Sequence, residues 1–232
     1  MSGRVEIVPV QGLPEVAAGD RLGELIAGAL AGAGEEVSTA DVLAVAQKAV
    51  SKAEGRVEET EDVVATVLRE AKTVRRRRGD LIIAETKHGF VCASAGVDRS
   101  NAPGEGWIVL LPEDPDASAA RIRSALGARF GTAPGVIVSD SFGRAWRHGT
   151  TDVAIGVAGM SPLLDLRGKQ DARGYELAST VIAVADELAG AAELVMGKAA
   201  GVPAAIVSGY AVPAGEGSAR DLVMPPERDL FP

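Results

Sequence analysis

The chain has 232 residues, of which 47% are hydrophobic and 24% charged, with 28 Gly and 12 Pro. This balance excludes a disordered, collagen-like or coiled-coil chain and predicts one or two globular domains. The single cysteine, Cys92, excludes an intramolecular disulfide and a cysteine-rich metal site. It also favours a reducing compartment, so we expect a cytoplasmic protein.

Charge and hydropathy exclude two classes of partner. The 32 acidic and 24 basic side chains give a net charge of −8, the wrong sign for a protein that binds nucleic acid through its phosphates. The longest uncharged run, Ala199–Gly215, contains glycines and prolines and falls short of the roughly 20 apolar residues that a membrane-spanning helix needs. We therefore expect binding neither to nucleic acid nor to membranes.

The predicted elements alternate irregularly between strands and helices. From the start of the chain they are a strand at Val5–Val10, a helix at Arg21–Ala31, a strand at Asp41–Ala46, a helix at Glu61–Arg77, and strands at Leu81–Thr86, Phe90–Ala93 and Trp107–Leu111. The second half adds a helix at Ala117–Arg129, strands at Gly135–Ser139 and Asp152–Val157, a long helix at Tyr175–Lys198 and a strand at Ala204–Val207. No fixed period repeats, so the order predicts a mixed α+β or α/β fold.

Several common catalytic motifs are absent from the sequence. There is no Walker A loop, no dinucleotide-binding GxGxxG after the first strand and no Gly-x-Ser-x-Gly elbow. The two histidines, His88 and His148, do not have the spacing of a zinc site.

Two acids stand out because each follows a predicted strand. Asp98 in GVDRSN and Asp140 in VSDSFGR lie beside a hydroxyl and an arginine. Carboxylate and hydroxyl oxygens suit Mg²⁺ or Mn²⁺ when substrate phosphates complete the coordination. A single Asp in such a position is more commonly a turn-former or a helix cap, so both interpretations stay open.

Other charged groups allow a functional and a structural interpretation. Lys48, Lys52, Arg99, Arg144 and Arg147 lie near these loops and could bind anions, although single surface cations are commonly solvated. Arg75–Arg78 are most simply a helix C-terminus, with phosphate or carboxylate binding as the alternative. Asp186 and Glu193 are expected to be solvated, and Glu216-Gly217-Ser218 is a phosphate-binding turn or an ordinary loop.

Several long segments together resemble one family. They are GLPE near the start, VAQKAVSKAEGR, HGFVCASAGVDRSN, LLPEDPDASA, VSDSFGRAWRHGTTDVAIGVAG, ADELAGAAELVMGK and the ending DLFP. In this order, over nearly the whole chain, they resemble the coenzyme F420-0:L-glutamate ligases. The resemblance implies a single ligase unit over residues 1–232 with a family-specific two-domain protomer fold, a homodimer, and no C-terminal flavin-reductase-like domain.

The resemblance also implies the reaction. It is a GTP-dependent ligation of L-glutamate to the lactyl carboxylate of the deazaflavin coenzyme F420-0 through an acyl phosphate, with further γ-linked glutamates as an extension. Mg²⁺ or Mn²⁺, two ions in all, would be the cofactor, with K⁺ as a further candidate. Alternatives are a nucleotide-dependent amide ligase for another polyglutamylated acid and a non-catalytic module that binds GTP and metal.

Site residues follow from the matched segments. The nucleotide contacts would be Leu13, Pro14, Glu15, Val16, Gln47, Lys52 and Asn101, with Lys52 also catalytic beside Asp98 and Asp140. The metal ligands would be Asp98, Asp140, Ser141 and Glu216. Arg99, Arg144 and Arg147 are candidates for the phosphodiester and carboxylates of the substrate, because a guanidinium binds such groups bidentately. The chain departs from the family pattern in a shortened segment between Arg56 and Asp80, in Ser94 in place of Asn, and in Ser141 in place of Thr.

Overall fold

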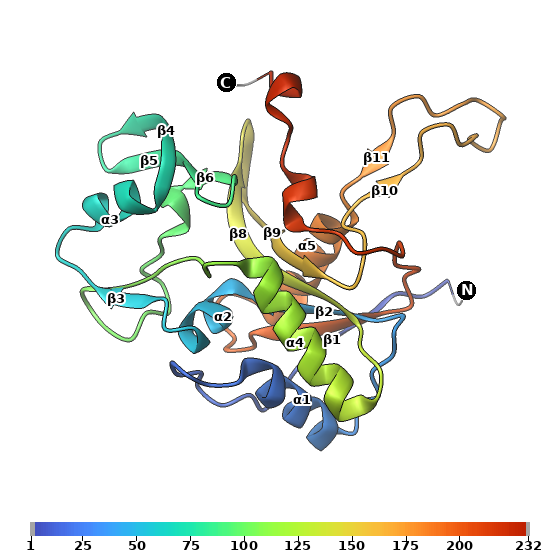
Figure 1. Cartoon of the computed structure of the whole chain (residues 1–232), viewed down its shortest axis with the longest axis horizontal. Helices are drawn as coiled ribbons and strands as arrows, with labels where there is room; N and C mark the ends of the chain where they lie inside the picture. Colours follow the sequence, from blue (N-terminus) through green and yellow to red (C-terminus); the bar gives the residue numbers. More distant parts are fainter. Residues whose placement is uncertain (1–2, 231–232) are drawn as a thin grey trace.

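The computed structural model describes residues 3–230, so the last two residues of the DLFP ending lie outside the described part (Figure 1). The helices are α1 (Leu22–Ala33), α2 (Gln47–Ala53), α3 (Val63–Glu70), α4 (Pro115–Phe130) and α5 (Val184–Met196). The strands are β1 (Glu6–Pro9), β2 (Val42–Ala46), β3 (Val57–Glu59), β4 (Ala71–Arg78), β5 (Leu81–Thr86), β6 (Val91–Ala93), β7 (Trp107–Val109), β8 (Gly135–Arg144), β9 (Arg147–Ala158), β10 (Leu164–Asp165), β11 (Val181–Ile182) and β12 (Ala204–Ser208). The predicted mixed α/β class is confirmed.

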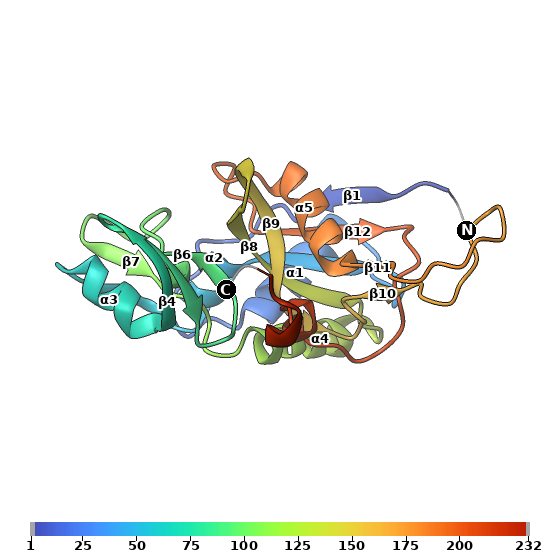
Figure 2. The same cartoon turned by 90° about the horizontal axis from the view of Figure 1, so that it is seen from above.

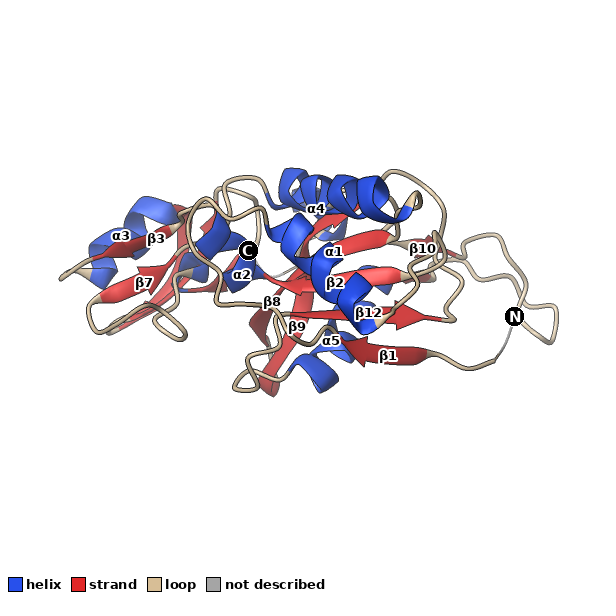
Figure 3. Cartoon of the chain, turned by 90° about the horizontal axis from the view of Figure 1, so that it is seen from below, coloured by secondary structure: helices blue, strands red, loops and turns tan. Residues whose placement is uncertain are grey.

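A five-stranded sheet in the order β1-β12-β2-β8-β9 organises the larger core. Only the β2–β8 pair is parallel, and the other neighbours are antiparallel. Helices α4 and α5 cover opposite faces of this sheet (Figure 2), and α1 packs beside α4 (Figure 3). The central strands are buried on both faces, which explains why β2 and the first half of β8 are continuous apolar runs.

A smaller body is formed by residues 57–110. It contains the antiparallel pair β3–β7, the three-stranded sheet β4-β5-β6 and helix α3. Its own cluster of buried apolar side chains includes Val67, Ile82, Ala84, Ile108 and Leu110. In Figure 1 this body lies to one side of the five-stranded sheet. The division of the chain into subdomains stays a prediction.

The predicted helix Glu61–Arg77 was wrong beyond Glu70. Asp62 caps α3 by accepting a hydrogen bond from the Ala65 N–H at 2.9 Å, and the chain then enters β4. Gly79, with φ of 60°, and Asp80 form a two-residue turn that returns the chain as β5, with Arg78 opposite Leu81. The arginines Arg75–Arg78 therefore lie on an exposed edge strand and not at a helix C-terminus.

The predicted helix Tyr175–Lys198 was wrong in its first two turns. Helix α5 begins at Val184, and residues 164–182 form an arm that extends from the body (Figures 1 and 2). Its strands β10 and β11 pair near the base, and hydrogen bonds within the arm, such as Asp171 N–H to Tyr175 O at 2.9 Å, continue beyond them. In the described residues, no helix is long and apolar enough to cross a membrane.

Gly156 on β9 gives a test of how α4 packs on the sheet. A Cβ at this position would overlap the carbonyl group of Pro115, the first residue of α4. We expect Gly156→Ala to destabilise the protein by about 1–3 kcal/mol, because backbone atoms would have to move. Gly143→Ala on β8 is the matched control, since a Cβ there meets nothing within 4 Å. Denaturant midpoints measure both changes, and equal midpoints for the two variants would contradict this packing.

Candidate active site

The site begins where β8 continues past the end of β2. The parallel pairing runs from Val42 opposite Gly135 to Ala46 opposite Ser139, and the chain then turns directly into α2. β8 continues to Arg144, paired on its other side with β9 alone. From Asp140 onward, one edge of β8 is therefore open. The carboxyl ends of parallel strands are where α/β sheets place their ligands.

A cavity of about 510 Å³ lies at this open edge, within the size range of roughly 300–1,000 Å³ that is usual for small-molecule sites. Its walls come from segments that are far apart in the sequence. They are the loop 13–16 after β1, residues 46–52 of β2 and α2, the loop 101–103, residues 139–141 of β8, Asp152 of β9, and residues 193–203 at the end of α5.

The seven expected nucleotide contacts line this one cavity, although they come from three separate segments: Leu13, Pro14, Glu15, Val16, Gln47, Lys52 and Asn101. The Lys52 ammonium lies 2.9 Å from a Glu15 carboxylate oxygen, and this pairing lowers the pKa of Glu15. The Gln47 side chain is buried, and its amide donates to the Leu110 carbonyl at 2.9 Å and to Ser51. Gln47 therefore also ties the start of α2 to the smaller body.

The Asp140 carboxylate is the most perturbed acid of the cavity. Burial raises its pKa to about 7, although the Ser141 N–H donates to it at 2.9 Å, and the neighbouring charge of Asp152 acts in the same direction as burial. Asp140 lies within strand β8, so the prediction that it follows a strand in a loop was wrong. A buried carboxylate of this kind is stabilised in its charged form by a nearby cation.

Asp98 reaches the same region through Lys48. The Lys48 ammonium lies 2.7 Å from Asp98 and donates to Ser100, while Ser100 donates to Asp98 from its backbone and its hydroxyl. Burial raises the pKa of Asp98, but these hydrogen bonds outweigh burial and hold it below its ordinary value. The charges of Lys48 and Asp98 both act on Asp140 as well. Two carboxylates 42 positions apart thus share one electrostatic environment.

Charges in the cavity wall nearly cancel. Three lysines, Lys48, Lys52 and Lys198, face four acids. A nucleoside triphosphate carries several negative charges, so these lysines alone leave much of its charge unbalanced. The wall therefore favours a phosphate ligand that arrives with a cation.

Comparison with known proteins agrees with the geometry. The sequence profile of the F420-0:gamma-glutamyl ligase family matches residues 12–209. This chain belongs to the F420-0:gamma-glutamyl ligase family. The chain is 41% identical to the coenzyme F420:L-glutamate ligase of Methanothermobacter thermautotrophicus, over 98% of both chains. It is 42% identical to the Methanopyrus kandleri protein of the same name and 39% identical to that of Methanocaldococcus jannaschii, each over 98% of this chain and 97% of the relative.

The oxygen donors of this family member fit a divalent cation in part. Within residues 3–230, no group of three or more His, Cys, Asp and Glu side chains is arranged to hold a metal by itself. Mg²⁺ sites that substrate phosphates complete need only one or two carboxylates. Asp140 and Ser141 are oxygen donors in the cavity wall, and Asp98 adjoins the wall through its ion pair with Lys48. These residues fit a cation that binds together with phosphate.

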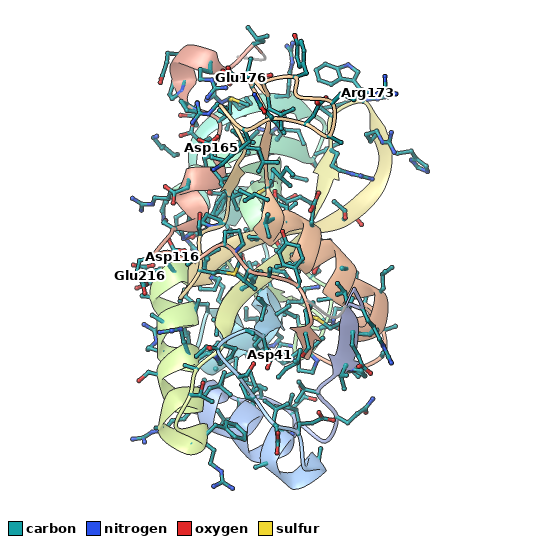
Figure 4. The ribbon with its side chains drawn as sticks, turned by 90° about the vertical axis from the view of Figure 1, so that its right-hand side faces the viewer. Asp41, Asp116, Asp165, Arg173, Glu176 and Glu216 are labelled. Carbon is teal, nitrogen blue, oxygen red and sulfur yellow. The ribbon has the colours of Figure 1, made fainter. Side chains whose placement is uncertain are left out.

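Besides Asp98, which contacts the wall through its ion pair with Lys48, four expected site residues lie away from the cavity wall. Glu216 is exposed on the segment that passes the start of α4, where Ser218 donates to Asp116 at 2.6 Å (Figure 4). Arg144 and Arg147 face each other at the exposed end of the β8–β9 hairpin, and Arg99 is exposed beside Asp98. The structure does not bring these four together with the nucleotide set.

The structure adds residues that the sequence analysis missed. Asp152 and Ser139 line the cavity from within strands, and the segment Gly197–Pro203 closes it at the end of α5. In the sequence, this segment could have been recognised by its run of small residues around Lys198, between a helix and a strand. Glu193 was expected to be solvated but faces the cavity, where burial raises its pKa. Asp186 was also expected to be solvated, and it accepts the Ala154 N–H at 2.9 Å instead.

Proposed function

We propose that this protein is a GTP-dependent ligase that joins L-glutamate to the lactyl carboxylate of coenzyme F420-0, with further γ-linked glutamates as an extension. One observation carries the proposal: the seven expected nucleotide contacts line the same cavity as Asp140 and Ser141. Family membership and the names of the relatives, coenzyme F420:L-glutamate ligase, support the choice of substrates. The choice of guanine over adenine rests on the resemblance of these segments to the family.

Amide formation from a carboxylate needs activation, because a carboxylate is a poor electrophile. The lactyl carboxylate oxygen would attack the γ-phosphorus of GTP, the bond to the β-phosphate oxygen would break, and GDP would leave. The amine of glutamate would then attack the carbonyl carbon of this acyl phosphate and release inorganic phosphate. Positioning and charge stabilisation are what a protein contributes to such a transfer.

The chain's own residues supply both contributions. Lys52, on the wall with the nucleotide contacts, would hold phosphate oxygens as a point charge, and Lys48, one turn earlier on the same face of α2, would do so as well. The loop 13–16 and Asn101 would fix the base and ribose in place. Asp98, Asp140 and Ser141 would hold Mg²⁺ or Mn²⁺, which supplies Lewis-acid stabilisation of the charge on the transferred phosphoryl group. We also propose that a second divalent ion, and K⁺, bind together with the phosphates.

We further propose that the active form is a homodimer, since two-fold dimers are the commonest oligomers. Light scattering would then give about twice the 23.7 kDa chain mass. A monomer at micromolar concentration would contradict this part of the proposal.

The reaction is tested by incubating the protein with GTP, Mn²⁺, L-glutamate and F420-0 and measuring product mass. We expect a mass increase of one or more glutamyl units that depends on GTP, with ATP giving much lower kcat/KM. The same reaction with a folate in place of F420-0 tests the alternative acceptor. GTP binding without release of phosphate for any acceptor would contradict a ligase and favour a non-catalytic binding module.

Removing the charge of either Asp98 or Asp140 tests the cation site. Asp98→Asn and Asp140→Asn keep the side-chain shape but remove a negative charge, so we expect turnover to fall by at least about two orders of magnitude in each. The double variant should be little worse than either single variant, because the two residues act as a unit. Near-normal turnover with an unchanged circular dichroism spectrum would exclude that residue from the site.

A further inference from the structure

Asp152 is a buried carboxylate for which the described residues provide no ion pair. It is 5% exposed, and it accepts hydrogen bonds from two serine hydroxyls of β8. Ser141 donates at 2.6 Å to one carboxylate oxygen, and Ser139 donates at 2.8 Å to the other. Burying a carboxylate is costly unless hydrogen bonds compensate. The chain therefore keeps this charge beside the cavity with two specific partners.

An irregularity in the β8–β9 pairing creates this contact. Val136, Ile137 and Val138 pair with Ala158, Val157 and Gly156, but Ser139 then pairs with Ala154. Ile155 is the extra residue of this bulge on β9. Side chains alternate between the two faces of a sheet. One extra residue in β9 therefore moves each β9 side chain beyond it to the opposite face, relative to its partners on β8.

This change of face determines which β9 side chain contacts Ser141. With the bulge, Ser141 lies directly opposite Asp152, and both side chains share a face with Ser139. In the unshifted register Ser141 would lie opposite Val153, and Asp152 would face away from both serines. Bulges are common beside active sites because they re-aim side chains in this way.

The direction of these hydrogen bonds fixes the serine protons. An ionised carboxylate only accepts, so the Ser141 hydroxyl proton points at Asp152. The lone pairs of the Ser141 oxygen are then free to accept, and Ser141 lines the cavity, as does its neighbour Asp140. A hydroxyl can coordinate a cation only through a lone pair, and outer residues that turn a ligand toward its metal commonly change metal affinity by about 10- to 100-fold.

We propose that Asp152 is a positioning residue that holds the Ser141 hydroxyl with its oxygen presented to the divalent cation of the phosphoryl-transfer site. This inference rests on the proposed function, since it assumes that Asp98, Asp140 and Ser141 hold that cation. Asp152 acts through Ser141 and does not touch the substrate.

The test measures Mn²⁺ affinity by electron paramagnetic resonance in the presence of a non-hydrolysable GTP analogue. Asp152→Asn replaces an acceptor oxygen by a donor, and Asp152→Glu keeps the charge but displaces the carboxylate. We expect each to weaken Mn²⁺ binding at least about tenfold. Ser141→Ala should weaken it similarly, and Ser141→Thr should retain it because the hydroxyl remains.

A double variant separates positioning from charge. If Asp152 acts through Ser141, Asp152→Asn added to Ser141→Ala should weaken Mn²⁺ binding by no more than about twofold beyond Ser141→Ala alone. Asp165→Asn is the matched control for net charge, because Asp165 lies exposed on the arm and pairs with Arg167 (Figure 4). It should leave Mn²⁺ affinity unchanged.

Several results would overturn the inference. Wild-type affinity in Asp152→Glu would show that charge alone matters, and fully additive losses in the double variant would show that Asp152 acts independently of Ser141. A lower Tm with unchanged Mn²⁺ affinity would make Asp152 a purely structural residue. Failure of the wild-type protein to bind Mn²⁺ would instead overturn the proposed cation site, and this inference with it. Should Asp152→Asn not fold, Asp152→Glu decides the question.

Discussion

The unequal length of two parallel strands is the constraint on which this site depends. β2 ends opposite Ser139, where α2 begins, while β8 continues as one strand of a hairpin with β9. The open edge exposes Asp140 and Ser141 to the cavity, and the immediate start of α2 places Gln47, Lys48 and Lys52 beside them. A longer β2 would cover the carboxylate and remove the cavity at the same time.

Balance of charge is the second constraint. Asp140 is buried beside Asp152 and within the field of Asp98, and burial raises its pKa to about 7. Lys48 offsets part of this negative charge by pairing with Asp98. Such a cluster is poorly suited to bind bare phosphates and well suited to bind phosphates with a divalent cation, because each partner then neutralises the other. The net charge of −8 is therefore compatible with a polyanionic substrate.

The sequence alone predicted most strands of the central sheet and the start of α4, because buried apolar runs and the Asp114-Pro115 cap are local signals. It failed at Ala71–Arg77, where the pairing of β4 with β5 outweighed helical spacing, and at Tyr175–Ala183, before the start of α5. Pairing across a turn depends on partners that periodicity does not reveal.

The same limit applies to the site. The matched segments predicted a nucleotide set whose seven residues line one cavity. Asp152 was missed because the sheet face to which its side chain points depends on a bulge at Ile155 that spacing does not show. Glu193 was missed because a helix position opposite the apolar stripe can face either solvent or a cavity. Glu216 was expected to be a metal ligand from its local sequence, but the fold places it near α4 and away from the cavity (Figure 4).

We expect one divalent cation to bind between Asp98 and Asp140 at the open edge of β8. The most direct measurement is the anomalous scattering of Mn²⁺ in crystals of the protein grown with Mn²⁺ and a non-hydrolysable GTP analogue. We predict a peak within coordination distance of both carboxylates and of a phosphate oxygen of the nucleotide. A nucleotide in the cavity whose Mn²⁺ contacts neither Asp98 nor Asp140 would contradict it.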